Sequence, residues 1–397
     1  MALGRKQVTV MLGIAQTLSW ASSYYLLAVL AKPISQSVGT SYSLVFGAFS
    51  AALLVAAAVG PIAGRLIDRF GGRYVLMGSN ILFAAGLLLL SQATEAMHLF
   101  IAWAVMGVAM GSGLYEAAFA TVVRLYGQSA RSSITGITLF AGFASTVGWP
   151  LSSWLESQYS WQVACMVWAA LHLLLGFPLN ALLGRATPDV KALADSPKVA
   201  SAEARPSTAT QELNLQRTAF LMAYVFAVTC FISTAMAAHL PQILQTSGAA
   251  VTVAIAAAAL VGPAQVAGRV LEYSFLQNAH PLLSARLAIL AHPLAAICLG
   301  VAGAPAASVF AILHGLGNGI LTIAIGTLPL KVFGAQGYGQ RQGWLMVPAR
   351  TVQAGSPFLF GLAVAQWGSQ ALWLSSLLAI SAFAALWMMR VPSSGVR

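Results

Sequence analysis

The stretch Gly64-Arg65-Leu66-Ile67-Asp68-Arg69-Phe70-Gly71-Gly72-Arg73 decides the fold, because it places charged residues between two long apolar runs. The runs cover residues 43–67 and 74–92. Each is long enough to cross a hydrocarbon core of ~30 Å, which takes about 20 helical residues. Three arginines and one aspartate cannot lie in lipid, so the stretch is predicted to be a tight loop at a membrane surface. Gly71 and Gly72 permit the sharp turn that this loop requires.

The same pattern recurs about 200 residues later in the chain. Val59-Gly60-Pro61 and residues 63–68 match Val261-Gly262-Pro263 and residues 267–272. Further pairs at similar offsets are Gly111-Ser112-Gly113 with Gly317-Asn318-Gly319, Gly148-Trp149-Pro150 with Gly355-Ser356-Pro357, and Lys32-Pro33 with Leu240-Pro241. A repeat of this kind predicts two similar halves arranged in tandem.

The composition indicates an integral membrane protein. Hydrophobic residues make up 59% of the 397 residues and charged residues only 7%, whereas a soluble domain carries about 25% charged residues. The net charge of +11 comes from basic residues scattered singly between apolar spans, so no nucleic-acid partner is expected. The three cysteines, Cys165, Cys230 and Cys298, lie within apolar spans without metal-type spacing. No metal site is expected, and the role of these thiols stays open.

Twelve apolar spans are expected, at residues 8–30, 43–67, 74–92, 98–122, 134–155, 161–183, 218–240, 251–273, 283–302, 306–328, 344–366 and 370–389. They predict an all-α membrane protein of two pseudo-symmetric six-helix halves, residues 1–183 and 218–397. Residues 184–217 form a polar segment rich in Pro, Ala, Ser and Thr, which is typical of a flexible cytoplasmic linker. The first apolar run has no small-residue cleavage site, so we expect it to remain as the first helix.

The charged loop resembles the loop between the second and third helices of the major facilitator superfamily, in the order G-x-L-x-D-R-x-G-x-R. Gly72 departs from that pattern, since a basic residue is usual there. The resemblance implies a secondary transporter that works by alternating access. It also implies that the aspartate and the basic residues latch the cytoplasmic side, and the corresponding residues here are Gly64, Asp68, Arg69, Gly71 and Arg73.

The chain also resembles the monocarboxylate-porter-like branch of that superfamily, which includes bacterial organic-anion exchangers. The resemblance rests on residues 64–73, Trp161, residues 239–248, Gly268-Arg269 and a cation in the eleventh span. In that branch, cations in the eighth and eleventh spans bind the substrate carboxylate, which implies this role for Arg269 and Arg350. Two departures are Gln162, where an arginine is common, and Trp149, which interrupts a Gly-Pro pair typical of antiporters.

Arg350 is the most informative ionisable residue within a span. A charged residue at the bilayer centre costs roughly 2.5–3.5 kcal/mol or more. Arg350 shares a helical face with Met346, Gln353 and Pro357. Either it snorkels to the cytoplasmic surface, or it is a fixed cation in a water-filled cavity and binds an anionic substrate.

Glu116, in the fourth span, is the acid that lies well inside an apolar run. It either carries a proton, since burial raises the pKa of a carboxyl group, or is a static partner for Arg124. Through the repeat, Ser112 and Glu116 correspond to Asn318 and Thr322. Other candidates for substrate binding share a helical face within one span: His314, Asn318 and Thr322 in the tenth, and Trp20 and Tyr24 in the first.

These features predict a secondary carrier for a small organic anion, with coupling to protons as an open possibility. The alternatives are an exporter of drugs or toxic compounds, metalloids included, and a transporter-like sensor that binds without transport. No P-loop, nucleophile elbow or metal-ligand cluster marks an enzyme, and no cofactor is expected. The expected partners are a small-molecule substrate, the lipid bilayer and protons, and we expect a monomer.

The positions of the basic residues predict the orientation. Except for Lys32, the basic residues outside the spans fall on the same side of the membrane as the charged loop. We therefore expect a protein of the inner membrane with both termini in the cytoplasm. A single cysteine placed at Ser37 should therefore react with an impermeant thiol reagent added from outside, and one placed at Ser201 should not. The reverse labelling pattern would overturn this orientation.

Overall fold

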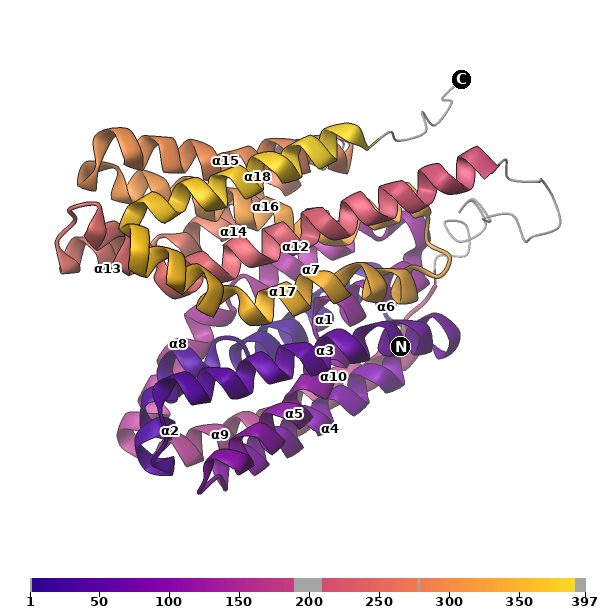
Figure 1. Ribbon diagram of the computed structural model, residues 1–397. Helices are drawn as coiled ribbons and strands as arrows, with labels where there is room; N and C mark the ends of the chain where they lie inside the picture. Colours follow the sequence, from indigo (N-terminus) through magenta and orange to yellow (C-terminus); the bar gives the residue numbers. More distant parts are fainter. Residues whose placement is uncertain (1, 189–208, 278, 390–397) are drawn as a thin grey trace. The chain divides into compact units, whose positions relative to one another are not determined.

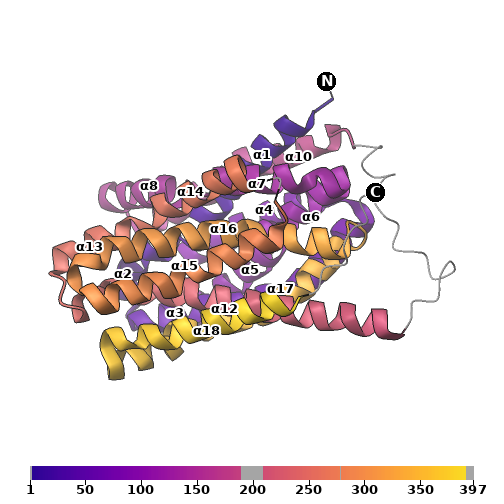
Figure 2. The same cartoon turned by 90° about the horizontal axis from the view of Figure 1, so that it is seen from above.

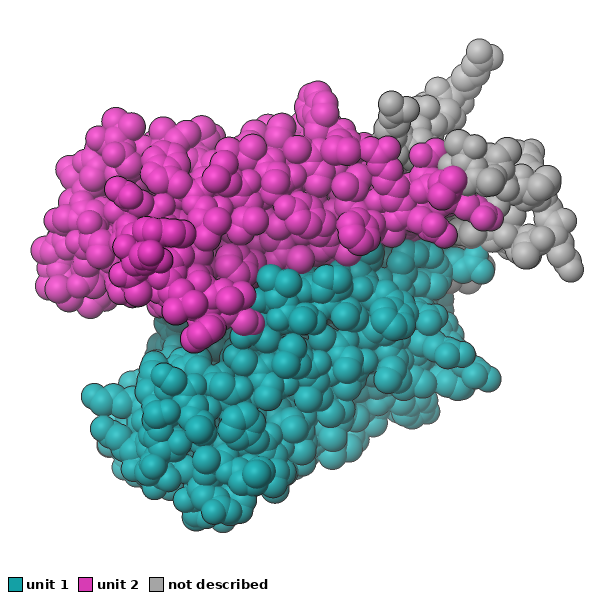
Figure 3. Space-filling view, viewed as in Figure 1, with its two compact units in different colours: residues 1–196, 335–354 teal, residues 197–334, 355–397 magenta. Residues whose placement is uncertain are grey.

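The computed structural model describes residues 2–188, 209–277 and 279–389, and its elements are helices (Figure 1). An isolated bridge between Leu3 and Ala186 is the one extended pairing among these residues. The chain divides into two compact units, coloured separately in Figure 3. Unit 1 comprises Met1–Ser196 and Ala335–Ala354, and unit 2 comprises Pro197–Gly334 and Gly355–Arg397.

Unit 1 contains the helices of the N-terminal part of the chain. They are α1 Arg5–Ala21, α2 Leu26–Val38, α3 Tyr42–Phe70, α4 Gly72–Ser91, α5 Ala96–Gly113, α6 Tyr115–Tyr126, α7 Arg131–Ala141, α8 Ala144–Gln158, α9 Trp161–Leu171 and α10 Phe177–Ala181. A π-helix, His172–Gly176, joins α9 to α10. The first part of α17, Tyr338–Trp367, also belongs to this unit as far as Ala354.

Unit 2 contains α12 Ala209–Thr246, α13 Val251–Ala259, α14 Val261–Leu271, α15 Pro281–Ala302, α16 Ala307–Phe333, the rest of α17, and α18 Ala371–Met388. A second π-helix, Glu272–Leu276, follows α14. Within this unit α15 packs along α16, and Figures 1 and 2 show the two helices side by side.

Each of the twelve predicted spans is mostly helical in the described chain. Nine helical stretches among the described residues are long and apolar enough to cross a membrane. Two of them, Ala96–Gln158 and Tyr338–Met388, have 63 and 51 residues, enough for more than one crossing each. Most of the predicted linker, residues 189–208, lies outside the described residues, and α12 already begins at Ala209. The division into residues 1–183 and 218–397 stays a prediction.

Four of the predicted spans are interrupted: the fifth at residues 142–143 and the eighth at Leu260, besides the first and the fourth. The first span breaks at residues 22–25, between α1 and α2, and the fourth breaks at Leu114, whose φ of −86° and ψ of −163° are extended. Irregular backbone at membrane depth is tolerated where it is buried in protein or lines a cavity. These two interruptions place Tyr24 and Glu116 at helix ends rather than in the middle of continuous helices.

Small residues allow the helices of unit 1 to approach closely. A Cβ atom added at Gly107 or Gly111 of α5 would come within 2.6 and 2.8 Å of the carbonyl oxygens of Ala52 and Ala56 on α3. Helices in membranes associate through such close backbone contact, since apolar surface gains little by leaving lipid. The α3–α5 packing therefore fixes the part of α5 that leads into the break at Leu114.

Candidate functional site

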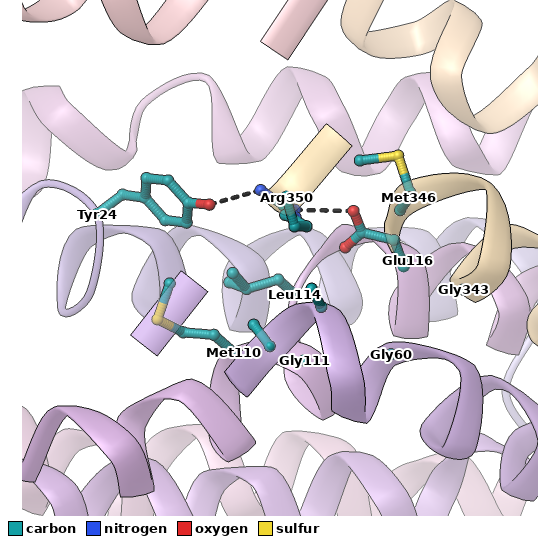
Figure 4. A pocket seen from close by; sticks show the side chains of 11 residues that line it. Tyr24, Gly60, Met110, Gly111, Leu114, Glu116, Gly343, Met346 and Arg350 are labelled. Carbon is teal, nitrogen blue, oxygen red and sulfur yellow. Dashed lines mark hydrogen bonds and ion pairs between the residues drawn. The ribbon is translucent and has the colours of Figure 1, made fainter. Parts of the chain in front are cut away.

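Arg350 of α17 lies at the centre of a polar cluster within unit 1. Its Nη1 donates hydrogen bonds to the Tyr24 hydroxyl at 2.5 Å and to Oε1 of Gln353 at 2.9 Å. Its Nη2 donates to Oε1 of Glu116 at 2.8 Å, which makes an ion pair. The Tyr24 hydroxyl also donates to Oε1 of Gln353 at 3.2 Å. Figure 4 shows Tyr24 and Glu116 approaching Arg350 from two sides.

The cluster lines a small cavity (Figure 4). α3, α5 and α17 contribute apolar or small residues to its walls, and the polar part of the lining is Tyr24, Glu116 and Arg350. Trp20 packs behind Tyr24, with ring centroids 4.6 Å apart, and also against Tyr115 at 4.8 Å. These ring contacts position the Tyr24 side chain beside Arg350.

The charges in this cluster compensate each other. The Arg350 side chain is 9% exposed and the Glu116 side chain 16%. A guanidinium keeps its proton in proteins, so a buried arginine requires an anion or several acceptors nearby. Glu116 lies in the first turn of α6, where the helix dipole also favours a negative charge. The break at Leu114 starts a new helix and so places Glu116 at a helix N-terminus, where it pairs with Arg350.

A second small cavity, with a mostly apolar lining and a few polar side chains, lies within unit 2. His314 and Asn318 of α16 line it together with Thr229 and Ser233 of α12 and His292 of α15. Asn318 donates from Nδ2 to the Ser233 hydroxyl at 3.0 Å, and Nδ1 of His292 lies 3.1 Å from Nδ1 of His314. This cavity has no charged side chain among its described lining residues.

Asp68, in the last turn of α3, binds the start of α17. Its Oδ1 accepts a hydrogen bond from the backbone N–H of Gly339 at 2.9 Å, and its Oδ2 accepts one from Gln340 at 2.8 Å. Both N–H groups are in the first turn of α17, where no intrahelical acceptor is available and the helix dipole is positive. A carboxylate at this position satisfies two free donors and the dipole together.

Glycines make this contact possible. A Cβ atom at Gly64 would collide with the Gly339 carbonyl, and one at Gly339 would come within 2.6 Å of the Gly64 carbonyl. Gly71 has a φ of 88° between α3 and α4, a conformation that favours glycine. A Cβ atom at Gly72 would collide with the Thr121 side chain, which explains why no basic residue occupies this position.

The basic residues of the same loop lie around the end of α3. Arg124 of α6 donates to the carbonyl oxygens of Asp68 and Arg69, the latter at 3.2 Å, and so caps the C-terminus of α3. The Arg69 and Arg73 guanidinium groups lie over the rings of Phe70 and Tyr74, at 5.0 and 5.3 Å from the ring centroids. The loop is thus fixed by its own neighbours as well as by α17.

Residues 12–347 match the family described as Major Facilitator Superfamily. This chain belongs to the major facilitator superfamily. It is therefore a multi-pass membrane protein of a transporter family, and the predicted superfamily is confirmed.

Local segments of this transporter are similar to several curated proteins. It is 35% identical over 117 residues to monocarboxylate transporter 13 of Rattus norvegicus, covering 28% of this chain and 26% of the relative. It is 31% identical over 125 residues to a multidrug resistance protein B homolog of Mycobacterium tuberculosis, covering 31% and 23%. It is 28% identical over 158 residues to the 4-hydroxybenzoate transporter PcaK of Pseudomonas putida, covering 39% and 34%. The chain thus spans only about a quarter to a third of the length of these relatives.

Solved structures of the superfamily are similar over nearly the whole transporter. The human organic anion transporter MFSD10 (TETRAN) has a TM-score of 0.67 and 15% identity, over 96% of this chain and 99% of that one. The proton:xylose symporter XylE has a TM-score of 0.71 and 13% identity, over 98% and 96%. At such low identity the similarity shows the fold alone, and it confirms the predicted all-α superfamily fold.

The residues that the sequence singled out fall into separate groups in this transporter. Arg350, Gln353, Tyr24 and Glu116 meet in unit 1, with Trp20 packed behind them. Arg350 bonds inside the protein rather than snorkelling to the surface, and Arg124 bonds to backbone carbonyls rather than to Glu116.

The other candidates lie in unit 2. His314 and Asn318 line its cavity, whereas the Thr322 hydroxyl donates to the Asn318 carbonyl of its own helix at 2.8 Å. Arg269, on α14, is 5% exposed, and Glu272 lies one turn further along the chain and is 1% exposed. The cavity lining does not include Arg269.

The sequence is consistent with Asp68 binding basic groups or a helix N-terminus, but it did not identify α17 as that helix, or Thr229 as a cavity residue. A backbone N–H donor can be predicted from sequence only where the start of a helix can be predicted. The sequence Gly337-Tyr338-Gly339 is a weak signal for a helix start. The sequence also did not predict the contact between His292 and His314, because it depends on how α15 and α16 align. That alignment could have been suggested only by the glycines of α16, which allow α15 to approach.

The Asp68 contact yields a testable prediction. Asp68→Asn removes the charge and one of two acceptors, which weakens charge-assisted hydrogen bonds worth about 1.5–3 kcal/mol each. If the contact latches a conformation of the protein, the rate of substrate uptake into proteoliposomes should fall several-fold while the affinity for substrate changes little. Glu95→Gln, at an exposed acid, is the matched control. Unchanged uptake in Asp68→Asn would reduce the contact to a structural cap.

Proposed function

We propose that this transporter carries a small organic anion of the monocarboxylate kind by alternating access, together with a proton that Glu116 binds. The observation that carries the proposal is the buried Arg350 guanidinium, which faces a cavity and holds Glu116 as its anion. We further propose that the protein lies in a cytoplasmic membrane with both termini in the cytoplasm and acts as a monomer.

The guanidinium is suited to a carboxylate. Its planar N–H groups can bind both oxygens of a carboxylate through two parallel hydrogen bonds, which a lysine cannot reproduce. Nη2 is the group that Glu116 now occupies, and Nη1 serves two neutral acceptors, Tyr24 and Gln353. A substrate carboxylate therefore competes with Glu116 for the same cation.

Charge balance couples this competition to a proton. The Arg350–Glu116 pair is neutral, and a substrate anion added to it would leave one net negative charge in a buried site. Burial of an uncompensated charge is costly, so the carboxylate that gives up the arginine gains a proton instead. One anion then enters with one proton, and the site is neutral before and after binding.

The named relatives agree with this substrate class. Monocarboxylate transporter 13 and the 4-hydroxybenzoate transporter PcaK both have names that refer to carboxylates. The multidrug resistance protein B homolog favours the alternative, export of drugs or other toxic compounds. A sensor that binds without transport is the third outcome that the following experiments can distinguish.

Arg350 provides the first test of this function. Removal of the guanidinium should cost about 2–5 kcal/mol of anion binding, which is roughly 30-fold or more in affinity. Arg350→Lys should weaken binding of lactate, benzoate or 4-hydroxybenzoate measurably although the charge is kept, and Arg350→Gln should abolish it. The measurements are thermal shift and uptake into proteoliposomes.

Arg350→Gln alone leaves Glu116 unpaired, so the double variant Arg350→Gln/Glu116→Gln serves as the folding control. Arg286→Lys is the matched arginine control, because Arg286 donates to the Leu386 carbonyl at the end of α18. Normal carboxylate transport by a monodisperse Arg350→Gln protein would refute the anion carrier. Stabilisation of the wild type by amphiphilic drugs, with no response to carboxylates, would favour the exporter.

Glu116 provides the second test. Glu116→Gln removes the site of the coupled proton and leaves a neutral hydrogen-bond acceptor beside Arg350. Accumulation of carboxylate driven by a pH gradient should be lost, while exchange of labelled for unlabelled carboxylate should continue. Loss of both activities in a folded protein would make Glu116 a structural partner of Arg350 and not the proton carrier.

A further inference from the structure

The histidine pair in the unit 2 cavity forms a hydrogen-bonded chain that ends on α18. Nδ1 of His292 lies 3.1 Å from Nδ1 of His314, and Nε2 of His292 lies 2.9 Å from the Ser375 hydroxyl. The Ser375 hydroxyl can itself donate to the Leu372 carbonyl at 2.9 Å. All three side chains are buried, and they come from α15, α16 and α18.

Proton counting restricts this pair to few states. Two neutral imidazoles carry two protons on four ring nitrogens, and the Nδ1–Nδ1 hydrogen bond uses one of these protons. One of the two outer Nε2 atoms must then be bare. If Ser375 donates to Leu372, His292 holds its proton on Nε2, and the bare nitrogen is Nε2 of His314. If Ser375 turns its proton towards His292, the bare nitrogen is Nε2 of His292.

We infer that the His292–His314 pair is a proton-binding site that accepts one proton and no more. A third proton occupies the bare Nε2 atom and leaves the Nδ1–Nδ1 bond intact, so the positive charge is shared between two rings. A fourth proton would place two N–H groups face to face across 3.1 Å and break that bond. The site lies apart from Glu116, and the inference does not depend on the proposed anion.

The cavity can supply the proton and solvate the charge. Besides the histidines, its polar lining is Thr229, Ser233 and Asn318. The Thr229 hydroxyl is buried and has no hydrogen-bond partner within the described part of the chain. Water enters a cavity that offers two to four polar partners, and this lining meets that requirement next to His314.

Other titratable groups are kept out of the cavity. α13 and α18 carry none. Charged or titratable residues do occur on the other elements around the pair. They are Glu212, Arg217, Tyr224, Cys230 and His239 of α12, Arg269 of α14, Glu272 and Tyr273 of the π-helix after α14, Arg286 and Cys298 of α15, and Lys331 of α16. None of these residues lines the cavity, so titration there is a property of the pair.

Ring-nitrogen NMR of purified, 15N-histidine-labelled transporter tests the site. At about pH 7.5 one ring of the pair should be the δ tautomer and the other the ε tautomer. As the pH falls to about two units below the ordinary histidine pKa of about 6.5, both rings should change in a single step with one midpoint. His172 is the control within the same sample, because it is equally buried but bonds to Ser22 and Asn80 rather than to a histidine.

Variants make the test specific. In His314→Leu, His292 loses the partner that shares the charge, and it should stay neutral over the same pH range. Glu116→Gln, in contrast, should leave the step of the pair unchanged. Two rings that stay neutral in the folded wild type, two separate midpoints, or an unshifted His292 step in His314→Leu would each overturn the inference. The wild-type spectra decide the question even if the leucine variant does not fold.

Discussion

The buried positive charge of Arg350 constrains everything around it. A guanidinium stays protonated in proteins, so other groups of the protein must provide a negative charge or hydrogen-bond acceptors at membrane depth. Glu116 supplies the charge, and Tyr24 and Gln353 supply neutral acceptors. Two of these partners come from breaks in helices, because a residue at a helix end can turn towards the cavity more freely than one in the middle of a helix. The irregular backbone of the first and fourth spans thus lies beside residues that compensate the charge on the eleventh.

The position of α17 depends on backbone contact as much as on charge. Gly64 and Gly339 bring α3 and α17 together so closely that no side chain fits between them. This closeness puts the first-turn amides of α17 within reach of the Asp68 carboxylate. The amides that bind Asp68 and the Arg350 side chain therefore belong to one helix within unit 1, about three turns apart. The first turn of α17 and Arg350 thus belong to one continuous helix, with Pro348 between them.

The sequence could predict the helices and the superfamily, because apolar runs and the repeated Gly-Arg motif are local signals. It could also mark Arg350, Glu116 and Tyr24, since polar residues in apolar spans are rare and costly. The breaks at residues 22–25 and at Leu114 were not predicted, because polar residues within a span do not by themselves distinguish a broken helix from a continuous one. Their cause is tertiary: each break is stabilised by partners that lie far away in the chain. The pairing of His292 with His314 was missed for the same reason.

The two polar clusters differ in what they can bind, and the difference follows from their charges. The cluster in unit 1 contains a fixed cation, so it can exchange one anion for another only if a proton neutralises the anion that is displaced. The cluster in unit 2 contains neutral groups, so an added proton is itself the only new charge and has to be spread over two rings. An anion carrier gains from such a division. In the carrier that we propose, the first cluster would select the substrate by its carboxylate, and the second would respond to pH without competing for that carboxylate.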